Sequence, residues 1–420
     1  MINKFLKPEV KKALLRFALE YGKKRAGTLK QKNEGYEKKQ TELKVLREKI
    51  FKDLKAIQNQ TVKALEKNGI QVHLAQDASE ARKIFNRIVG KKTRLAQAKT
   101  SALAEITNKD FLKGKNLLKT DLGDFLANLI DNNQGAHPVL PIIEFSSERI
   151  TELLYQKFKK RVESTPEAIS RFVKGEIRQR LLEIQVGITG ANAVTAQGEI
   201  VLIENEGNIS LVSRLPETHI VIVGMEKLVP SLKEANQLIE AMCLWGTGQD
   251  KPVYTSIITG PSKTADIENK LVVGAQGPKE VHLILLDNGR SKLINHGFCE
   301  LLHCLNCGAC LNFCPVFNAI GGRYGGTYLG SRGVIQTAFA NDPVTAREAN
   351  CFACTLCQAC QRNCPVGIDL PGLMKELRHF LKKEGVQTKE NQEMLKNLEK
   401  YGNPFGKVEK GHLPKKLYCC

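Results

Sequence analysis

Thirteen cysteines dominate the chemistry that this 420-residue sequence could perform, and ten of them lie between Cys299 and Cys364. Eight form two runs of one spacing, C-x2-C-x2-C-x3-C-P, namely Cys304, Cys307, Cys310 and Cys314, then Cys354, Cys357, Cys360 and Cys364. Three thiolates separated by two residues can surround one face of an iron–sulfur cube, which leaves the fourth iron for a cysteine from elsewhere. The repeated pattern therefore predicts two [4Fe–4S] clusters.

The fourth cysteine of each run has a separate role in this prediction. In two-cluster ferredoxins it binds the other cluster, and the proline after it turns the chain away. By that rule Cys304, Cys307, Cys310 and Cys364 hold cluster 1, and Cys354, Cys357, Cys360 and Cys314 hold cluster 2. The exchange also places the clusters close together, as electron relay requires. Zinc is the alternative metal, but it usually takes two separated C-x2-C pairs, so the complete repeat favours iron.

Five cysteines remain outside this assignment. Cys351 extends the second run, and a register using Cys351, Cys354 and Cys357 is geometrically possible. Only the Cys354 register places the final x3-Cys-Pro correctly, so we interpret Cys351 as a spare thiol. Cys299 is expected to be buried or helix-facing, and Cys243 to be an ordinary core residue. The adjacent Cys419 and Cys420 could bind metal or be redox-active, although an exposed tail without a role is the simpler interpretation.

Other residues near the cysteines give weaker signals. His303 either tunes a cluster through a hydrogen bond or is a solvated helix residue. The glycine-rich loop 321–326, with Arg323, could hold an anion, but it lacks the preceding strand and following helix of a phosphate loop. The sequence has no GxGxxG in such a context, so we expect the chain to bind neither NAD nor FAD tightly.

The elements that position these residues fall into four predicted segments. They are a basic arm of two helices joined near Gly27 (1–67), an α/β domain (68–290), a mostly helical two-cluster domain (291–375) and a basic tail (376–420). Short apolar runs in the second segment predict strands at 70–74, 199–203, 219–223, 253–258 and 281–286, and several of them are too continuously apolar to have one face in water. Capping boxes at Ser164 and Ser231 predict helix starts between them. This alternation predicts a mainly parallel sheet covered by helices.

The net charge of +19 is concentrated at the ends, with +10 in residues 1–60 and +5 in residues 371–420. Acidic residues are interspersed and aromatics are few, which favours a docking surface for an acidic protein over nucleic-acid binding. No apolar run approaches the roughly 18 residues needed to cross a bilayer, and residues 1–27 show no signal-peptide core. We therefore expect a cytoplasmic protein without a transmembrane segment, in which crowded thiols ligate metal instead of forming disulfides.

Several motifs carry a resemblance to a known family. Residues 187–192, 204–208, 219–221 and 224–227, supported by 69–73, 77–81 and 120–124, together resemble the lactate-utilisation (LUD) domain. Followed by residues 287–290 and the Cys304 run, they resemble the LutB-like iron–sulfur subunits of bacterial L-lactate utilisation complexes. The resemblance covers about residues 1–375. Departures are Arg323-Tyr324, where relatives usually have a histidine and an aromatic residue, the extra Cys351, and a short region after the second run.

This resemblance implies a fold, an activity and partners. The fold is a sugar-isomerase or CoA-transferase-like α/β domain followed by a helical ferredoxin-type domain. The activity is oxidation of L-lactate to pyruvate, in which this subunit relays electrons beside a cysteine-rich heterodisulfide-reductase-like subunit and a second, cluster-free LUD subunit. A relay for another 2-hydroxy acid or another oxidoreductase, and a redox-sensing module, are the alternative hypotheses.

No catalytic residue is assigned, but two turns are candidates for a ligand loop. Glu204, Glu206 and Asn208 follow a predicted strand, where α/β folds commonly bind ligands. Thr189, Gly190 and Asn192 could supply an anion-binding backbone. Both stretches are equally well explained as tight turns. We interpret His219 as a satisfied residue at a strand start and not as a general base.

Overall fold

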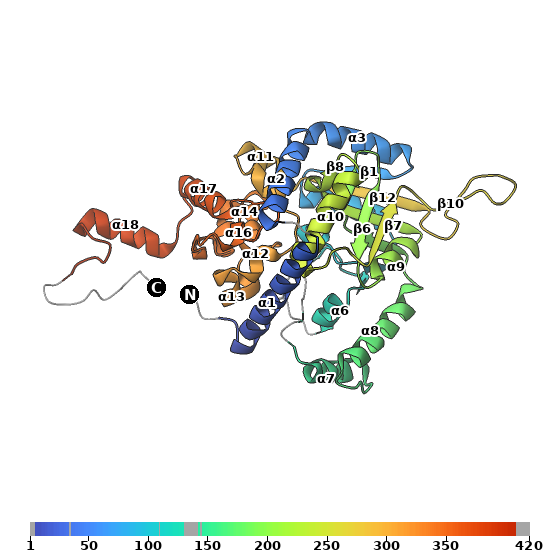
Figure 1. Cartoon of the computed structure of the whole chain (residues 1–420), viewed down its shortest axis with the longest axis horizontal. Coiled ribbons are helices and arrows are strands. Elements are labelled where there is room, and N and C mark those ends of the chain that lie inside the picture. Colours follow the sequence, from blue (N-terminus) through green and yellow to red (C-terminus); the bar gives the residue numbers. More distant parts are fainter. Residues whose placement is uncertain (1–4, 33–34, 109, 130–141, 143–144, 409–420) are drawn as a thin grey trace.

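The computed structural model describes residues 5–32, 35–108, 110–129, 142 and 145–408. Three parts follow one another along the chain: a helical arm, an α/β part and a helical cysteine-rich part (Figure 1). In the described ranges no helix is long and apolar enough to cross a membrane. Cys419 and Cys420 lie outside the described residues.

The α/β part is built on a six-stranded sheet in which every neighbouring pair is parallel, as predicted. Its order is β1-β12-β7-β4-β2-β3, with β1 Gln71–Ala75, β2 Arg94–Gln97, β3 Asn116–Lys119, β4 Val186–Thr189, β7 Thr218–Gly224 and β12 Glu280–Leu286. Ile220 and Ile222 of β7 enter one hydrophobic cluster, and Val221 and Val223 enter another. The inner strands β7 and β12 are largely apolar because both faces of this sheet are covered, whereas the edge strand β1 is partly exposed.

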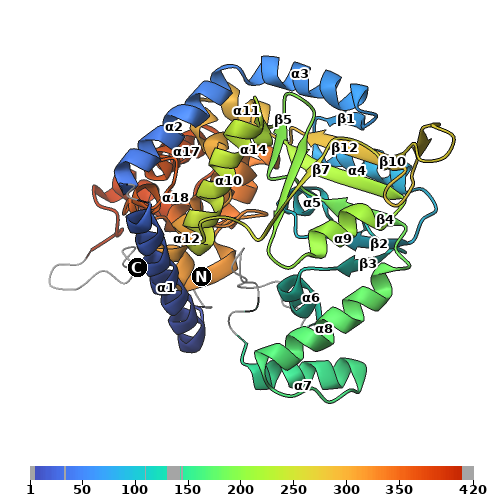
Figure 2. The same cartoon turned by 45° about the vertical axis from the view of Figure 1, so that its right-hand side comes forward.

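Helices cover this sheet on both sides (Figure 2). α4 Ala78–Val89 and α5 Ser101–Ile106 pack on the face of Ile220, while α6 Leu122–Leu129, α7 Ser147–Phe158 and α8 Pro166–Leu181 enclose the β3 side. The short α9 Asn208–Arg214 lies beside β4. The predicted cap of α8 is shifted by one residue, because Thr165 and not Ser164 accepts the hydrogen bond from the Ala168 amide.

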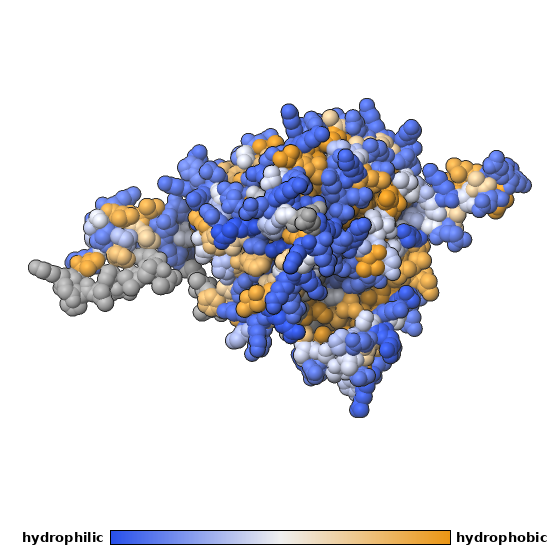
Figure 3. All heavy atoms as spheres, in the orientation of Figure 1, coloured by the Kyte–Doolittle hydropathy of each residue, from blue (hydrophilic) through white to orange (hydrophobic). Residues whose placement is uncertain are grey.

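A smaller mixed sheet lies beside the parallel one. Its order is β8-β5-β6-β9, with β5 Ala193–Thr195, β6 Ile200–Glu204, β8 Leu228–Val229 and β9 Tyr254–Ile258. η1 Met225–Lys227 precedes β8, and α10 Leu232–Thr247 follows it with Ser231 as the predicted N-cap. The hairpin of β10 Lys263–Thr264 and β11 Val272–Val273 projects from the body, and Figure 3 shows apolar atoms on it.

The N-terminal arm contains three helices, not two. They are α1 Pro8–Gln31, α2 Tyr36–Lys52 and α3 Leu54–Lys67. Gly27 lies inside α1, where a glycine costs only about 1 kcal/mol of helix propensity, so the first break comes after Gln31. α1 packs against α10 of the α/β part and also against the cysteine-rich part, and α2 contacts the segment before Cys304. The arm therefore joins the two other parts through one hydrophobic core.

The cysteine-rich part is helical, as predicted. It comprises α11 Arg290–Asn295, η2 Cys299–His303, α12 Ala309–Asn312, α13 Pro315–Ile320, η3 Gly321–Arg323, α14 Gly330–Ala340, α15 Pro343–Glu348, η4 Cys351–Ala353, α16 Ala359–Arg362 and α17 Leu370–Lys383. The glycine-rich loop places Tyr324 in the core, fully buried, with its hydroxyl 2.8 Å from Ser331 Oγ. A last helix, α18 Lys389–Tyr401, projects from the body and has no buried residue (Figure 1).

Candidate metal centre

The two cysteine runs adopt the same backbone conformation. The residues on either side of the second cysteine are left-handed in both runs: Asn306 (φ 62°) and Gly308 (φ 78°), then Leu356 (φ 57°) and Gln358 (φ 63°). A one-turn helix follows each, α12 or α16. Leucine rarely adopts this region, and such strain persists where the surroundings enforce it, commonly at functional sites. The repeated conformation indicates two loops built for the same purpose.

The fourth cysteine of the second run lies with the first run. Cys364 lines one cavity together with Cys304, Cys307 and Cys310, and apolar residues of the wall include Leu305, Ile368 and Leu370. The negative charge of Cys304 contributes to raising the pKa of Cys364. In the same way the charges of Cys354 and Cys357 contribute to raising the pKa of Cys314, the fourth cysteine of the first run. The cavity therefore groups Cys364 with three thiols of the first run, here called the first set. The charges that Cys314 and Cys360 share with Cys354 and Cys357 fit a second set of these four cysteines.

Burial disfavours the ionised form of these thiols. It raises the pKa of Cys307, Cys360 and Cys364 to about 12, and neighbouring cysteine charges add to the effect. Metal ligands must be thiolates, so a cationic core is needed to hold them deprotonated. Four thiols around one cavity with largely apolar walls fit a [4Fe–4S] core, which takes four cysteine ligands. Cys310 also senses the charge of Cys360, so the two sets are neighbours.

The set that includes Cys314 is nearer to solvent. Cys357 is exposed, whereas Cys364 in the other set is 8% exposed. The backbone amide of Phe317 donates to Cys314 Sγ at 3.5 Å, at the start of α13. Arg378 donates to the carbonyl oxygens of Cys351 and Cys354, which holds the start of the second loop in place.

The remaining described cysteines lie away from the cavity of the first set. Cys351 is fully buried in the hydrophobic core, where burial raises its pKa to about 11. Cys243 is buried in α10, and Cys299 is partly buried at the start of η2. His303 is not solvated: it is 6% exposed and packs on Phe51 with ring centroids 4.8 Å apart. Burial lowers the pKa of this imidazole to about 4.

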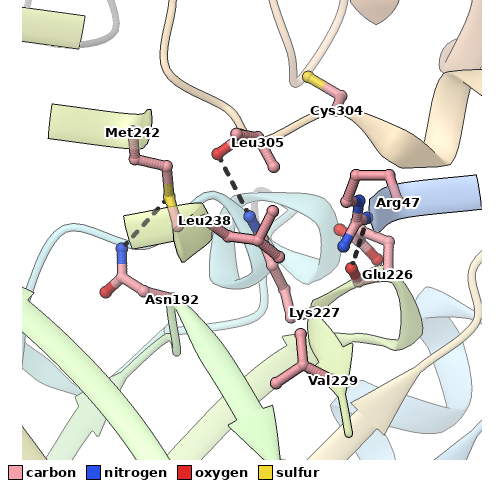
Figure 4. Close-up of a pocket in the computed structure, with 9 residues that line it drawn as sticks. All are labelled: Arg47, Asn192, Glu226, Lys227, Val229, Leu238, Met242, Cys304 and Leu305. Carbon is pink, nitrogen blue, oxygen red and sulfur yellow. Dashed lines mark hydrogen bonds between the residues drawn. The ribbon is translucent and has the colours of Figure 1, made fainter. Parts of the chain in front are cut away.

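Three cationic side chains surround the first set near Cys304. Arg47 of α2, Lys227 of η1 and Arg332 of α14 all sense the charge of Cys304. Figure 4 shows Arg47 and Lys227 beneath the loop of Cys304 and Leu305, where Lys227 Nζ lies 3.4 Å from the Leu305 carbonyl oxygen. Arg47 Nη2 donates to the carbonyl oxygens of Glu226 (3.0 Å) and Leu302 (2.7 Å). The arm, the α/β part and the cysteine-rich part therefore meet at this point.

A buried ion triad joins the parallel sheet to the same place. Arg290 is fully buried, with Nη2 2.7 Å from Glu105 Oε1 and Nε 2.5 Å from Glu226 Oε2. Burial alone would raise the pKa of Glu226, but Arg290 holds it at about 2. The hydroxyl of Tyr328 donates to Glu105 Oε1 at 2.6 Å. Glu226 and Arg290 follow β7 and β12, so the cysteine-rich part covers these carboxyl ends of the sheet.

The other half of the same sheet edge carries polar side chains. Lys99 follows β2, and its Nζ lies 3.4 Å from Asp124 Oδ1 and 3.9 Å from Asp121 Oδ1. Glu206 Oε2 accepts a hydrogen bond from the Leu122 amide at 3.1 Å, and Asn208 Nδ2 donates to Thr120 Oγ1 at 3.2 Å. Burial, then the charge of Asp121, raises the pKa of Glu206. Two of the six candidate loop residues therefore meet the loop after β3.

The other four candidate residues have contacts within the protein. Glu204 caps α9, since its carboxylate accepts hydrogen bonds from the amides of Ile209 (2.6 Å) and Ser210 (3.1 Å). Thr189 lies in β4 with Oγ1 2.8 Å from His219 Nε2. Gly190 lies against Thr100, where a Cβ would come within 2.7 Å of the hydroxyl oxygen. Asn192 lines the small pocket of Lys227 and accepts from the Ile203 amide at 3.0 Å.

His219 gives a pH-dependent prediction. Burial lowers its pKa to about 3, against 6.5 for an ordinary histidine. His219 is therefore protonated below about pH 6.5 in the unfolded chain but only below about pH 3 in the folded chain. The free energy of unfolding falls as the pH decreases through this window. At pH 5 the loss amounts to about 2 kcal/mol. Between pH 7.5 and 5, the Tm at fixed scan rate should fall further for the wild type than for His219→Gln; equal falls would contradict the prediction.

Sequence reasoning missed the cations around Cys304. Arg47 lies on a helix rich in lysines, where its spacing alone does not distinguish it from solvated neighbours. Arg332 had a usable signal, because it stands with Gln336 in the otherwise small or apolar helix α14. All described positions of that helix from Gly330 to Phe339 are buried.

Comparisons with known proteins agree with this architecture. The LUD domain family matches residues 58–286, and the 4Fe-4S dicluster domain family matches residues 300–368. Lactate utilization protein B of Bacillus subtilis is 31% identical over 347 residues, covering 81% of this chain and 71% of that protein. Lactate utilization protein B of Bacillus pumilus is 33% identical over 333 residues, covering 78% and 68%.

Two further matches are a relative with a different name and a solved structure. A protein of Escherichia coli K12 named "Uncharacterized electron transport protein YkgF" is 31% identical over 357 residues, covering 84% of this chain and 73% of that protein. A solved structure, of a DUF162-family protein from Deinococcus radiodurans, has a TM-score of 0.32 and 14% identity, covering 56% of this chain and 98% of that one.

Proposed function

This chain belongs to the LUD-domain family, in the branch with a 4Fe-4S dicluster domain that includes lactate utilization protein B, and we propose that it relays electrons through two [4Fe–4S] clusters. The observation that supports the proposal is the cavity that Cys364 of the second run shares with Cys304, Cys307 and Cys310 of the first run. Cluster 1 would be held by Cys304, Cys307, Cys310 and Cys364. Cluster 2 would be held by Cys354, Cys357, Cys360 and Cys314.

The substrate and partners of the relay are a further part of this proposal, which the relatives support by their names. Two relatives carry the name lactate utilization protein B, and we propose that this chain takes part in the oxidation of L-lactate to pyruvate in the cytoplasm. The partners would be a cysteine-rich heterodisulfide-reductase-like subunit and a second LUD subunit. The clusters supply one-electron transfer steps when bound. The protein's own residues enclose cluster 1 and leave cluster 2 nearer to solvent, with Cys357 exposed, so cluster 2 is the side on which a partner can exchange electrons.

A purified sample containing iron and acid-labile sulfide, mixed with the two partner subunits, tests the relay. Adding L-lactate without oxygen should bleach the cluster absorbance, and D-lactate serves as the matched control. Bleaching by dithionite but not by L-lactate would favour a redox-sensing module. Bleaching by a different 2-hydroxy acid alone would keep the relay and change the substrate.

The polar edge of the sheet gives a second prediction for this function. We propose that Glu206 and Asn208 face a small ligand there, since the raised pKa of Glu206 suits proton transfer. Glu206→Gln should then slow L-lactate-dependent cluster reduction by about 10²-fold while iron content stays unchanged. Glu163→Gln, an exposed change at a distance from this edge, is the control. Unchanged turnover in Glu206→Gln would remove the proposed ligand site and leave the relay intact.

A further inference from the structure

Arg332 is the most unusual charged residue around the cysteines. It is 5% exposed and lies in α14, yet its Nε and Nη1 atoms are buried without a hydrogen-bond partner among the described residues. A buried, unpaired donor on a charged group is costly, so such a group in a native protein calls for a missing partner. Arg332 also lines the cavity that Cys304, Cys307, Cys310 and Cys364 share. The unused donors therefore lie beside the place of cluster 1.

The position of Arg332 is fixed by contacts on its other side. Its guanidinium lies 3.6 Å from the ring centroid of Tyr328, a stacked cation–π geometry. Tyr328 is anchored in turn through its hydroxyl to Glu105, a member of the buried triad with Arg290. Gly333 permits this approach, since a Cβ there would come within 1.6 Å of the Tyr328 carbonyl oxygen. The protein thus holds the guanidinium in one orientation next to the cavity.

The surroundings of the two cysteine sets differ in charge. The charge of Cys304 in the first set helps to raise the pKa of Arg47, Lys227 and Arg332, so these three cations lie near that cysteine. The charges that contribute to the pKa shifts of Cys314 and Cys360 in the second set come from other cysteines, and the cation at that loop, Arg378, donates to the carbonyl oxygens of Cys351 and Cys354. Hydrogen bonds to the sulfurs and nearby charge are main determinants of an iron–sulfur potential. Cations and N–H donors favour the more negative, reduced form, and burial makes them stronger than exposed charges.

We propose that Arg332 donates hydrogen bonds to the sulfurs of cluster 1 and raises the reduction potential of that cluster relative to cluster 2. The inference rests on the proposed two-cluster function. Arg332 is a positioning and tuning residue, since it is not a ligand of the iron. With the higher reduction potential, cluster 1 would be reduced before cluster 2.

A redox titration of the intact, cluster-loaded protein, followed by electron paramagnetic resonance, tests this role. Arg332→Gln should lower the midpoint potential of one centre so that its reduction equilibrium changes at least tenfold, which is 59 mV for one electron, while the other centre keeps its potential. Arg332→Lys keeps the charge without the planar donors and should lower the same centre by less. Arg347→Gln, an exposed arginine near the second run, is the matched control and should shift neither centre.

The outcomes separate the two proposals. Two centres with potentials unaltered in Arg332→Gln, or both lowered equally, would overturn the role of Arg332 and leave the relay standing. Wild-type protein without iron and sulfide would overturn the relay itself. If Arg332→Gln does not assemble both clusters, the midpoint potentials of Arg332→Lys and Tyr328→Leu test the role of Arg332 instead. Tyr328→Leu removes the stacking surface, so it should lower the same centre, and unchanged potentials in both variants would overturn the inference.

Discussion

Cys364→Ser is expected to abolish the same paramagnetic centre as Cys307→Ser, although Cys364 belongs to the other run. Cys364 lines the cavity of Cys304, Cys307 and Cys310, so its loss removes one of four ligands from the cluster proposed there. Cys314→Ser should correspondingly abolish the centre that Cys357→Ser abolishes, since both belong to the second set. Each variant should lose about half of the iron and acid-labile sulfide.

Metal analysis and the spectrum of the dithionite-reduced protein measure this result. Cys351→Ser is the matched control, because Cys351 is the additional cysteine of the second run and is buried in the apolar core. It should keep both centres. If Cys364→Ser and Cys357→Ser abolish the same centre, each run binds its own cluster and the exchange is wrong. If Cys351→Ser abolishes a centre, the ligand register of the second run must move upstream.

Arg290→Met is expected to destabilise the protein by about 3–5 kcal/mol, because it leaves two buried carboxylates without their counter-ion. Glu105 and Glu226 both contact this guanidinium, and side-chain exposures in the triad are 0% for Arg290 and 2% for each glutamate. For a chain of this size the Tm should fall by roughly 3–6 °C. The clusters should also be lost at a lower temperature, since Glu105 holds Tyr328 beneath Arg332.

Differential scanning calorimetry at a fixed scan rate, together with cluster absorbance, measures the effect. Arg16→Ala is the control, because Arg16 and Glu20 form an exposed ion pair at 3.0 Å, which contributes less than about 1 kcal/mol. Adding Glu105→Gln and Glu226→Gln to Arg290→Met should recover part of the loss by removing the uncompensated charge. A fall in Tm for Arg290→Met no larger than that for Arg16→Ala would contradict the importance of the triad.

Local patterns explain why much of the fold could be predicted from the sequence. The strands at 70–74, 219–223 and 281–286 lie in the parallel sheet within one residue of the predicted bounds. β7 and β12 are largely apolar because both of their faces are buried, whereas β1 is a partly exposed edge strand. The strands β2, β3 and β4 were missed. They have four residues each, which is a short signal. β2 and β3 begin with the exposed polar residues Arg94 and Asn116, and the buried β4 contains Gly187, a residue that is uncommon in strands. The break of the arm was misplaced because glycine permits a helix interior when packing supports it.

Part of the candidate site could likewise be predicted from the sequence, and part could not. Cysteine spacing is local, so the ligand sets could be proposed from sequence, whereas the charges around them depend on tertiary contacts. Arg47 and Arg332 are 285 positions apart in the chain and act on the same cysteine. Glu204 illustrates the converse: its position after a strand indicated a ligand loop, but its carboxylate caps α9. Nothing in a single sequence distinguishes a capping carboxylate from a substrate-facing one such as that proposed for Glu206.

The arm that joins the two other parts has a consequence for synthesis of the protein. Arg25 donates to Asn363 across 338 positions, so at 5–20 residues per second α1 leaves the ribosome roughly 15–70 s before its partner exists. Until α10 is made, Leu14 and Phe17 lack the helix of the α/β part on which α1 packs, which exposes an apolar stripe of the nascent chain to aggregation. The proposed cluster 1 would likewise not assemble until the ribosome has delivered Cys364, one residue after Asn363.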